Sequence, residues 1–335
     1  MLATWHWHIE ISSKCTLRCP RCARQEVPDT LINTELDLEF FKRNFTPDFV
    51  QKNVEKVTFC GDDGDPIYAH DFIKVVEYLK NIKPISIVIV TNGSYKSQAW
   101  WQDLASHLGE NDQVHFSLDG WDQDSNNKYR VNCNWDSIIM GASTIISKSK
   151  AFTSWDAIAF KFNEHKLDDM LAMAKTMGFD QFQLTKSTKF GKIYSNYGDN
   201  DTLQPIDSLI SSSHRFEREI TNLSGRKVKE PWLDTNVKLF ESVKNVGNIK
   251  PLCHIGNKGL YINSRGEFYP CCWVANRYGH NSKWLELGKK FNLHTNNLVD
   301  VTDSLFWNNE FTNDSFECST KCNSERVTKN YATEW

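Results

Sequence analysis

The first 190 residues alternate between strand-like and helix-like segments, and this alternation limits the possible folds more than any other feature of the chain. Six segments have the spacing or the β-branched content of strands: residues 5–12, 54–60, 85–91, 113–119, 155–162 and 181–185. Five segments with helical spacing separate them: residues 34–45, 70–82, 97–108, 134–149 and 164–178. Strands that alternate with helices predict a parallel sheet with right-handed crossover connections.

The third strand segment, "ISIVIVT", is almost continuously apolar. Such strands suit a sheet that is covered on both faces. Periodicity does not separate an open α/β sheet from a partial barrel. In either case the residues that bind ligands are expected at the carboxyl ends of the strands.

Three cysteines, Cys15, Cys19 and Cys22, follow the first strand within the sequence "EISSKCTLRCPRCARQE". Of the ten cysteines of the chain, eight lie in two clusters toward its two ends, and Cys60 and Cys133 lie between them. In a reducing compartment such clusters indicate a metal site more often than a disulfide framework. A zinc site completed by His6, His8 or the distal cysteines is the alternative, although zinc sites usually show two CxxC-like pairs.

Small polar residues follow the next three strands as well. The second strand leads into "CGDDGDP" (60–66), the third into "TNG" (91–93) and the fourth into "SLDG" (117–120). Glycine lets the backbone approach a ligand closely. The side chains of Thr91, Asn92, Ser117 and Asp119 are therefore candidates to hydrogen-bond a polar small molecule at this edge of the sheet.

Taken together, CxxxCxxC, the Gly-Asp-Pro turn, TNG and SxDG resemble the radical S-adenosylmethionine (SAM) superfamily over residues 5–190. The resemblance implies a partial (β/α)6 TIM-like barrel. It also implies that Cys15, Cys19 and Cys22 hold a [4Fe–4S] cluster whose fourth iron binds SAM. In this family, reductive cleavage of SAM yields a 5′-deoxyadenosyl radical, which abstracts a hydrogen atom from the substrate.

Matching positions to the family gives a set of expected SAM-binding residues. "GDDGDP" stands where the family has GGEP, so Asp65 replaces the usual Glu and is expected to meet the SAM amino group. Asn92 and Ser117 are candidates for the ribose or the carboxylate, and Arg130 for the carboxylate unless it is a surface arginine. Arg21 occupies a position that is commonly aromatic. The expected cofactor-binding residues are Gly64, Asp65, Pro66, Thr91, Asn92, Ser117, Asp119 and Arg130.

The C-terminal part of the chain carries a second set of cysteines. Their spacing around Gly266, in a segment that reads as a hairpin (258–272), resembles the SPASM and twitch extensions of radical SAM enzymes, which hold an auxiliary [4Fe–4S] cluster. Cys272 is the doubtful member, because adjacent strand residues point to opposite faces. The expected ligands are Cys253, Cys271, Cys318 and Cys322.

This resemblance divides the chain into three parts. Residues 1–190 are expected to form the radical SAM barrel, residues 191–250 a linker or capping segment, and residues 251–335 a small α+β cluster domain. The auxiliary cluster suits a reaction that ends in net oxidation, because it can accept an electron.

The first strand places His6, His8 and Glu10 on one face and Trp5, Trp7, Ile9 and Ile11 on the other. If the first face lines the barrel, these three residues are candidates for substrate contact or proton relay, with Cys272 as a further weak candidate. If it faces helices, they are hydrogen-bonded core residues. Cys60 and Cys133 are expected to be packed thiols, although Cys60 is close enough in sequence to the Gly-Asp-Pro turn to face the SAM site.

Charge and hydropathy narrow the possible partners. The net charge is −3 and no basic stripe is present, which argues against nucleic acid. No long apolar run indicates a membrane span, and the start lacks signal-peptide features, so a cytoplasmic location is expected. The predicted reaction is hydrogen abstraction from a peptide side chain or a small polar molecule, giving oxidation or a cross-link. A reductase or flavodoxin-like protein is the expected electron donor.

Two other functions remain open from the sequence. One is a non-catalytic iron–sulfur or zinc protein that binds a partner. The other is a radical SAM enzyme that modifies a nucleic acid or nucleoside.

Overall fold

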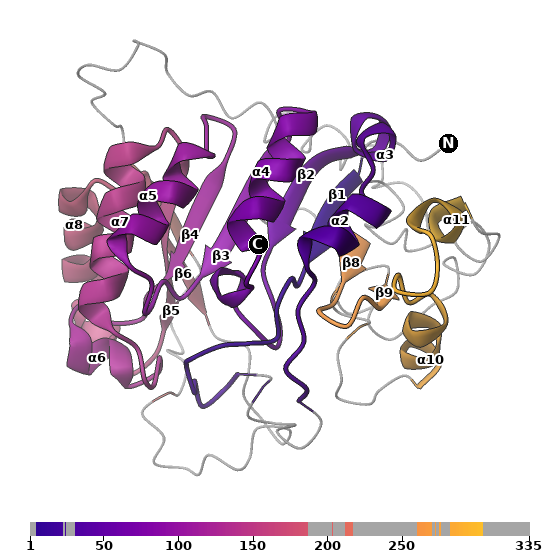
Figure 1. The fold of residues 1–335 in the computed structure, drawn as a ribbon. Helices are drawn as coiled ribbons and strands as arrows, with labels where there is room; N and C mark the ends of the chain where they lie inside the picture. Colours follow the sequence, from indigo (N-terminus) through magenta and orange to yellow (C-terminus); the bar gives the residue numbers. More distant parts are fainter. Residues whose placement is uncertain are drawn as a thin grey trace, which may run out of the picture.

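The computed structural model describes residues 5–22, 24, 31–186, 203, 212–216, 260–269, 272, 275 and 282–303. These residues form one nine-stranded sheet in the order β7-β6-β5-β4-β3-β2-β1-β8-β9 (Figure 1). The strands are β1 (Trp5–Ile9), β2 (Val54–Phe59), β3 (Ser86–Thr91), β4 (Gln113–Ser117), β5 (Phe152–Ala159), β6 (Gln181–Lys186), β7 (Ser212–Arg215), β8 (Leu260–Ile262) and β9 (Phe268–Tyr269). Strands β1 to β6 pair in parallel, which confirms the predicted α/β, TIM-like class.

Helices connect the parallel strands, and α4, α5 and α7 lie along one face of the sheet (Figure 1). The helices are α2 (Leu38–Asn44), α3 (Pro47–Asn53), α4 (Phe72–Ile82), α5 (Gln98–Ser106), α6 (Gln123–Asn127), α7 (Trp135–Lys148), α8 (Leu167–Met177), α10 (Ser282–Lys290) and α11 (Leu298–Asp303), with 3-10 turns η2 (Pro66–Tyr68) and η3 (Glu164–Lys166). Within the described part of the chain, none of these helices has the length and apolar character needed to cross a bilayer.

The two faces of the sheet differ in chemistry. On the helix-covered face, Trp7 packs edge-on against Phe45 and Phe49, with ring centroids 5.2 Å and 5.7 Å away. Because side chains alternate along a strand, the residues between these apolar positions point to the inner face of the barrel. Strand pairing sets these inner residues side by side: His6, His8, Lys56, Thr58, Gln113, His115, Ser154, Asp156, Gln181 and Gln183.

One predicted helix is wrong in its start and its length. Residues 34–45 contain α2, which is capped by Asp37 rather than by Thr34, and a second helix, α3, follows directly. The hydroxyl of Thr34 lies 2.9 Å from that of Ser264 and serves a tertiary contact. Pro47 occupies the first turn of α3, where its missing N–H costs nothing.

The predicted C-terminal hairpin is confirmed as β8 and β9, which pair antiparallel. Gly266 has φ +74° in its turn, a conformation that favours glycine. The sequence does not indicate where the hairpin docks. In the structure β8 pairs in parallel with β1, so the hairpin extends the barrel sheet beyond its first strand.

Asp112 fixes the end of the sheet that lies opposite the strands' carboxyl ends. Its fully buried carboxylate accepts hydrogen bonds from Lys80 Nζ (2.7 Å), Ile87 N (2.8 Å) and Gly109 N (2.6 Å). We expect Asp112→Ala to lower the free energy of unfolding by roughly 3–5 kcal/mol, because it leaves buried donors and a cation unpaired. Urea unfolding followed by tryptophan fluorescence measures this.

Lys52→Ala is the matched control, since it removes an ion pair to Asp48 in which both side chains are exposed. Its effect should stay below about 1 kcal/mol. Equal losses in the two variants would contradict the role given to Asp112.

Candidate functional site

The three N-terminal cysteines lie on the loop that leaves the carboxyl end of β1, here called the cysteine loop (residues 10–22). Cys22 N donates to Cys19 O (3.0 Å) within the loop. Arg18 N donates to Val131 O (2.9 Å), and Asn132 Nδ2 donates to Thr16 O (2.8 Å). The loop is therefore fastened at two points to the segment that follows α6.

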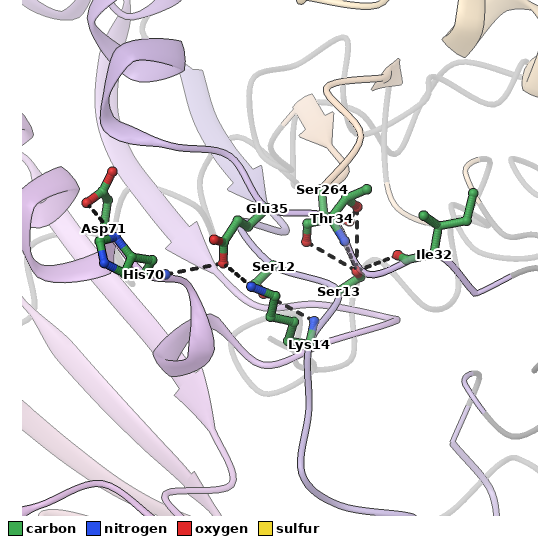
Figure 2. A network of polar contacts seen from close by, with 9 residues as sticks. All are labelled: Ser12, Ser13, Lys14, Ile32, Thr34, Glu35, His70, Asp71 and Ser264. Atoms are coloured by element: carbon green, nitrogen blue, oxygen red, sulfur yellow. Dashed lines mark hydrogen bonds and ion pairs between the residues drawn. The ribbon is translucent and has the colours of Figure 1, made fainter.

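A polar network holds the base of this loop from the other side. Ser13 Oγ accepts from Thr34 N at 2.8 Å, and Lys14 Nζ donates to Glu35 Oε2 at 3.0 Å; Figure 2 marks both contacts with dashed lines. The Thr34 hydroxyl also contacts that of Ser264, in the turn between β8 and β9. Residues from three distant parts of the sequence thus meet at the base of the loop.

The Cys19 thiol is buried and that of Cys15 is partly buried, and the pKa of each is raised to about 12, mainly by this loss of solvent. The nearby Asp65 carboxylate contributes to the raised pKa of Cys15, whereas Arg130 opposes the rise at Cys19. Both thiols are consequently protonated at neutral pH. A bound metal deprotonates a coordinating thiol outright, so iron binding here would release protons.

The donor set fits an iron–sulfur cluster better than one metal ion. Among the described residues, no three His, Cys, Asp or Glu side chains are gathered closely enough to hold a single ion. A cubane cluster does not require its ligands to surround a single point, because each cysteine binds a different iron. Sulfur is also the ligand type that these clusters use.

Arg130 forms an ion pair beside the cysteine loop, with only 17 % of its side chain exposed. Its Nε donates to Asp119 Oδ2 at 2.5 Å, and it also hydrogen-bonds Cys19. Asp119 is fully buried, and its Oδ1 accepts from Ile158 N at 2.6 Å. The surface position considered for Arg130 is therefore wrong, and the carboxylate of Asp119 is occupied by protein donors.

Asp65 joins the ends of β2 and β3. Its Oδ1 accepts from Thr91 Oγ1 (2.8 Å) and Ile67 N (3.2 Å), and its Oδ2 accepts from Asn92 N (2.7 Å) and Nδ2 (2.5 Å). Burial raises the pKa of Asp65, and these hydrogen bonds oppose the rise. Asn92 Nδ2 lies in addition 3.7 Å from Cys15 Sγ. The side chains that follow both strands therefore lie directly beside the cysteine loop.

The turn before Asp65 packs tightly on the cysteine loop. Asp65 N donates to Lys14 O at 2.9 Å. A β-carbon at Gly64 would lie 1.9 Å from the carbonyl oxygen of Ser12, so only glycine fits this approach. The structure thus places five further residues of the expected cofactor-binding set on this side of the cysteine loop: Gly64, Asp65, Pro66, Thr91 and Asn92.

His8 and Glu10 lie on the inner face of the barrel. The ring of His8 stands edge-on to that of Tyr261, with centroids 4.9 Å apart. Glu10 Oε1 accepts from Asp63 N (2.5 Å) and Gly64 N (3.2 Å), and its Oε2 accepts from the Tyr261 hydroxyl (3.0 Å). Sequence reasoning missed Tyr261, because nothing in the hairpin indicates that it pairs with β1.

A polar group on β4 and β5 was also missed. His115 Nδ1 lies 2.9 Å from Asp156 Oδ2, and His115 Nε2 lies 3.0 Å from Gln113 Oε1. The Asp156 side chain is 28 % exposed and is held also by Ser154 Oγ. Ser117, an expected cofactor residue, is the register partner of Asp156. The alternation of polar and apolar residues in "QVHFSLD" is the sequence signal that could have predicted these polar side chains on the inner face.

Of the cysteines outside the cysteine loop, the structure describes Cys60, Cys133 and Cys272. Burial raises the pKa of Cys60 and of Cys133, and Cys272 is buried as well. The other four members of the C-terminal set lie outside the described residues, so their role as cluster ligands stays a prediction: Cys253, Cys271, Cys318 and Cys322.

A family model described as the radical SAM superfamily matches residues 9–182. Among curated protein sequences, none matches the chain.

Several solved structures share the fold. Streptococcus suis SuiB bound to S-adenosylmethionine has a TM-score of 0.59 at 13 % identity, covering 97 % of this chain and 72 % of that one. SuiB bound to the precursor peptide SuiA has a TM-score of 0.58 at 14 % identity, covering 94 % and 68 %. The protein anSMEcpe with bound AdoMet has a TM-score of 0.59 at 16 % identity, covering 97 % and 85 %. Identities this low establish the fold alone.

The ion pair of Arg130 gives a first prediction for the site. Arg130→Gln leaves the buried Asp119 carboxylate unpaired, and we expect the free energy of unfolding to fall by roughly 3–5 kcal/mol. Adding Asp119→Asn should recover part of that loss, because it removes the unpaired charge. Urea unfolding of the wild type, the two single variants and the double variant measures both effects. Additive losses in the double variant would contradict the pairing.

His6 gives a prediction about pH. Burial, with the charge of Lys56, lowers the pKa of His6 to about 4. As pH falls, an unfolded histidine takes up its proton near pH 6.5, before the folded one does, so stability should fall between about pH 6.5 and pH 4. His6→Gln should lose less stability than the wild type between pH 7 and pH 5 in urea unfolding. His70→Gln, at an exposed histidine, should behave like the wild type.

Proposed function

The chain belongs to the radical SAM superfamily, and on that premise we propose that it is an enzyme that binds SAM and a [4Fe–4S] cluster and oxidises or cross-links a peptide side chain. When bound and reduced, such a cluster would supply the electron that splits SAM into methionine and a 5′-deoxyadenosyl radical, which would abstract a hydrogen atom from the substrate. The observation that carries the proposal is the convergence of the cysteine loop with the ends of β2 and β3, where Asp65 and Asn92 lie beside Cys15.

In this proposal each residue of the loop region has a defined task. Cys15, Cys19 and Cys22 are the cluster ligands. The backbone of the turn at Gly64, Asp65 and Pro66 faces the SAM amino group, since the Asp65 side chain is fully used by Thr91 and Asn92.

The other expected cofactor residues act at a distance from this turn. Arg130 pairs with the SAM carboxylate through guanidinium N–H groups that do not donate to Asp119. Ser117 serves the ribose. Asp119 holds Arg130 in place from behind.

The inner face of β4 to β6 is the proposed substrate wall. It carries hydrogen-bonding side chains rather than apolar ones, and the Asp156 carboxylate is partly exposed there. A polar wall suits a substrate that presents amide or hydroxyl groups. A peptide is favoured because SuiB was solved with its precursor peptide and anSMEcpe with a Kp18Cys peptide. A small polar molecule is the alternative.

The C-terminal part completes the proposal. We propose that an auxiliary [4Fe–4S] cluster is held by Cys253, Cys271, Cys318 and Cys322. These cysteines belong to a twitch-like domain (251–335), which follows the barrel (1–190) and a capping segment (191–250) in the sequence. With four cysteine ligands this cluster has no open site, so it would carry electrons. A cytoplasmic reductase or flavodoxin-like protein would supply the reducing electron.

The test is anaerobic reconstitution with iron and sulfide, followed by SAM and dithionite. The wild type should load about eight irons per chain and release 5′-deoxyadenosine, and the triple Cys15/Cys19/Cys22→Ala variant about four irons and no product. Cys133→Ala is the matched control, because this buried cysteine lies outside the proposed ligand set.

If the wild type is fully loaded with iron but releases no 5′-deoxyadenosine, the proposed enzymatic activity is refuted. The protein would then be a non-catalytic iron–sulfur protein. A chain that takes up zinc but no iron would also contradict the proposal. Tight, salt-sensitive binding of RNA in a filter assay would favour a nucleic-acid substrate instead.

A further inference from the structure

Tyr261 connects the C-terminal hairpin to the turn that leads into Asp65. Its hydroxyl donates to Glu10 Oε2 at 3.0 Å, across 251 positions of sequence. The other oxygen of Glu10 accepts the backbone N–H groups of Asp63 (2.5 Å) and Gly64 (3.2 Å). A continuous chain of hydrogen bonds thus runs from β8 through Glu10 to the turn.

The parts of this connection have little freedom to move. Strand β8 pairs with β1, and Glu10 N donates to Ile262 O at 2.8 Å. Tyr261 and Glu10 are both nearly fully buried. Burial and the charge of Glu10 raise the pKa of Tyr261, so its hydroxyl stays protonated and able to donate.

The turn held in this way is the one proposed to face SAM. We infer that Tyr261 is a positioning residue for SAM: through Glu10 it sets the place of residues 61–65, and the affinity for SAM therefore depends on the C-terminal hairpin. The inference rests on the proposed function. It adds to it a link between the barrel site and a part of the chain more than 240 residues away.

The hydroxyl group makes the side-chain part of this link, so that part can be removed with little else. Tyr261→Phe keeps the ring contact with His8 but leaves the buried Glu10 carboxylate without one of its donors. Tyr269 offers a matched control in the same hairpin. Its hydroxyl donates to Glu267 Oε2 at 3.1 Å, inside the hairpin, and takes no part in the chain of hydrogen bonds that reaches the turn.

The experiment measures the Kd of SAM by equilibrium dialysis on anaerobically reconstituted protein. Tyr261→Phe should raise the Kd about tenfold, since hydrogen bonds to charged groups are among the stronger ones, while iron content stays that of the wild type. Tyr269→Phe should change the Kd by less than about twofold. In a Glu10→Gln background, Tyr261→Phe should have little further effect, because the path through Glu10 is already broken.

Three outcomes would overturn the inference: an unchanged Kd for Tyr261→Phe, an equal change for Tyr269→Phe, or additive effects of Tyr261→Phe and Glu10→Gln. A wild type that does not bind SAM at all would instead refute the proposed function.

A second measurement needs no variant. Because coupling between two sites is reciprocal, SAM should slow amide exchange in residues 260–262 as well as in 61–65 of the wild type. Protection confined to residues 61–65 would contradict the link.

Discussion

The buried carboxylate of Asp65 is the constraint on which the candidate site depends. Taking a carboxylate out of water is costly unless hydrogen bonds replace its solvation. Asp65 receives four such bonds, from the end of β3 and from η2, while its own N–H reaches the cysteine loop. The ends of three strands are therefore fixed to one another by a single residue.

The same residue explains a departure from the family's usual pattern. A glutamate, one methylene longer, would carry its carboxylate farther from its own backbone. The aspartate is short enough to cap η2 at Ile67 and still reach Thr91 and Asn92. The turn is therefore held from within the protein, by the side chain of Asp65 and by its N–H bond to Lys14 O.

The sheet separates packing from chemistry through its two faces. Trp7 and Trp155 lie fully buried among aromatic neighbours on the helix side. On the inner side, His115 and Asp156 satisfy each other instead of packing against an apolar layer. A barrel whose interior is filled by layers of apolar side chains would have no such wall. Alternation along each strand is enough to produce both surfaces from one sheet.

Local signals in the sequence predict much of this structure, whereas long-range pairing does not follow from them. The strand and helix periods place β1 to β6 and most helices within a few residues, and they place Trp7 and His8 on opposite faces. Thr34 was wrongly predicted to cap a helix, because a threonine hydroxyl can serve equally as a helix cap or as a partner in a tertiary hydrogen bond. The docking of β8 on β1, and with it Tyr261, depends on contacts between segments far apart in the chain. The roles of Asp119 and Arg130 likewise become visible only when burial pairs them.

The parallel pairing of β8 with β1 has a consequence for synthesis of the chain. During synthesis β1 finds one neighbour in β2 after some fifty residues, but its other neighbour only after about 250. Until then one edge of β1 exposes unpaired backbone groups, which is a feature that promotes association between chains. The barrel strands can pair early, but the nascent sheet keeps an open side until the C-terminal hairpin has emerged.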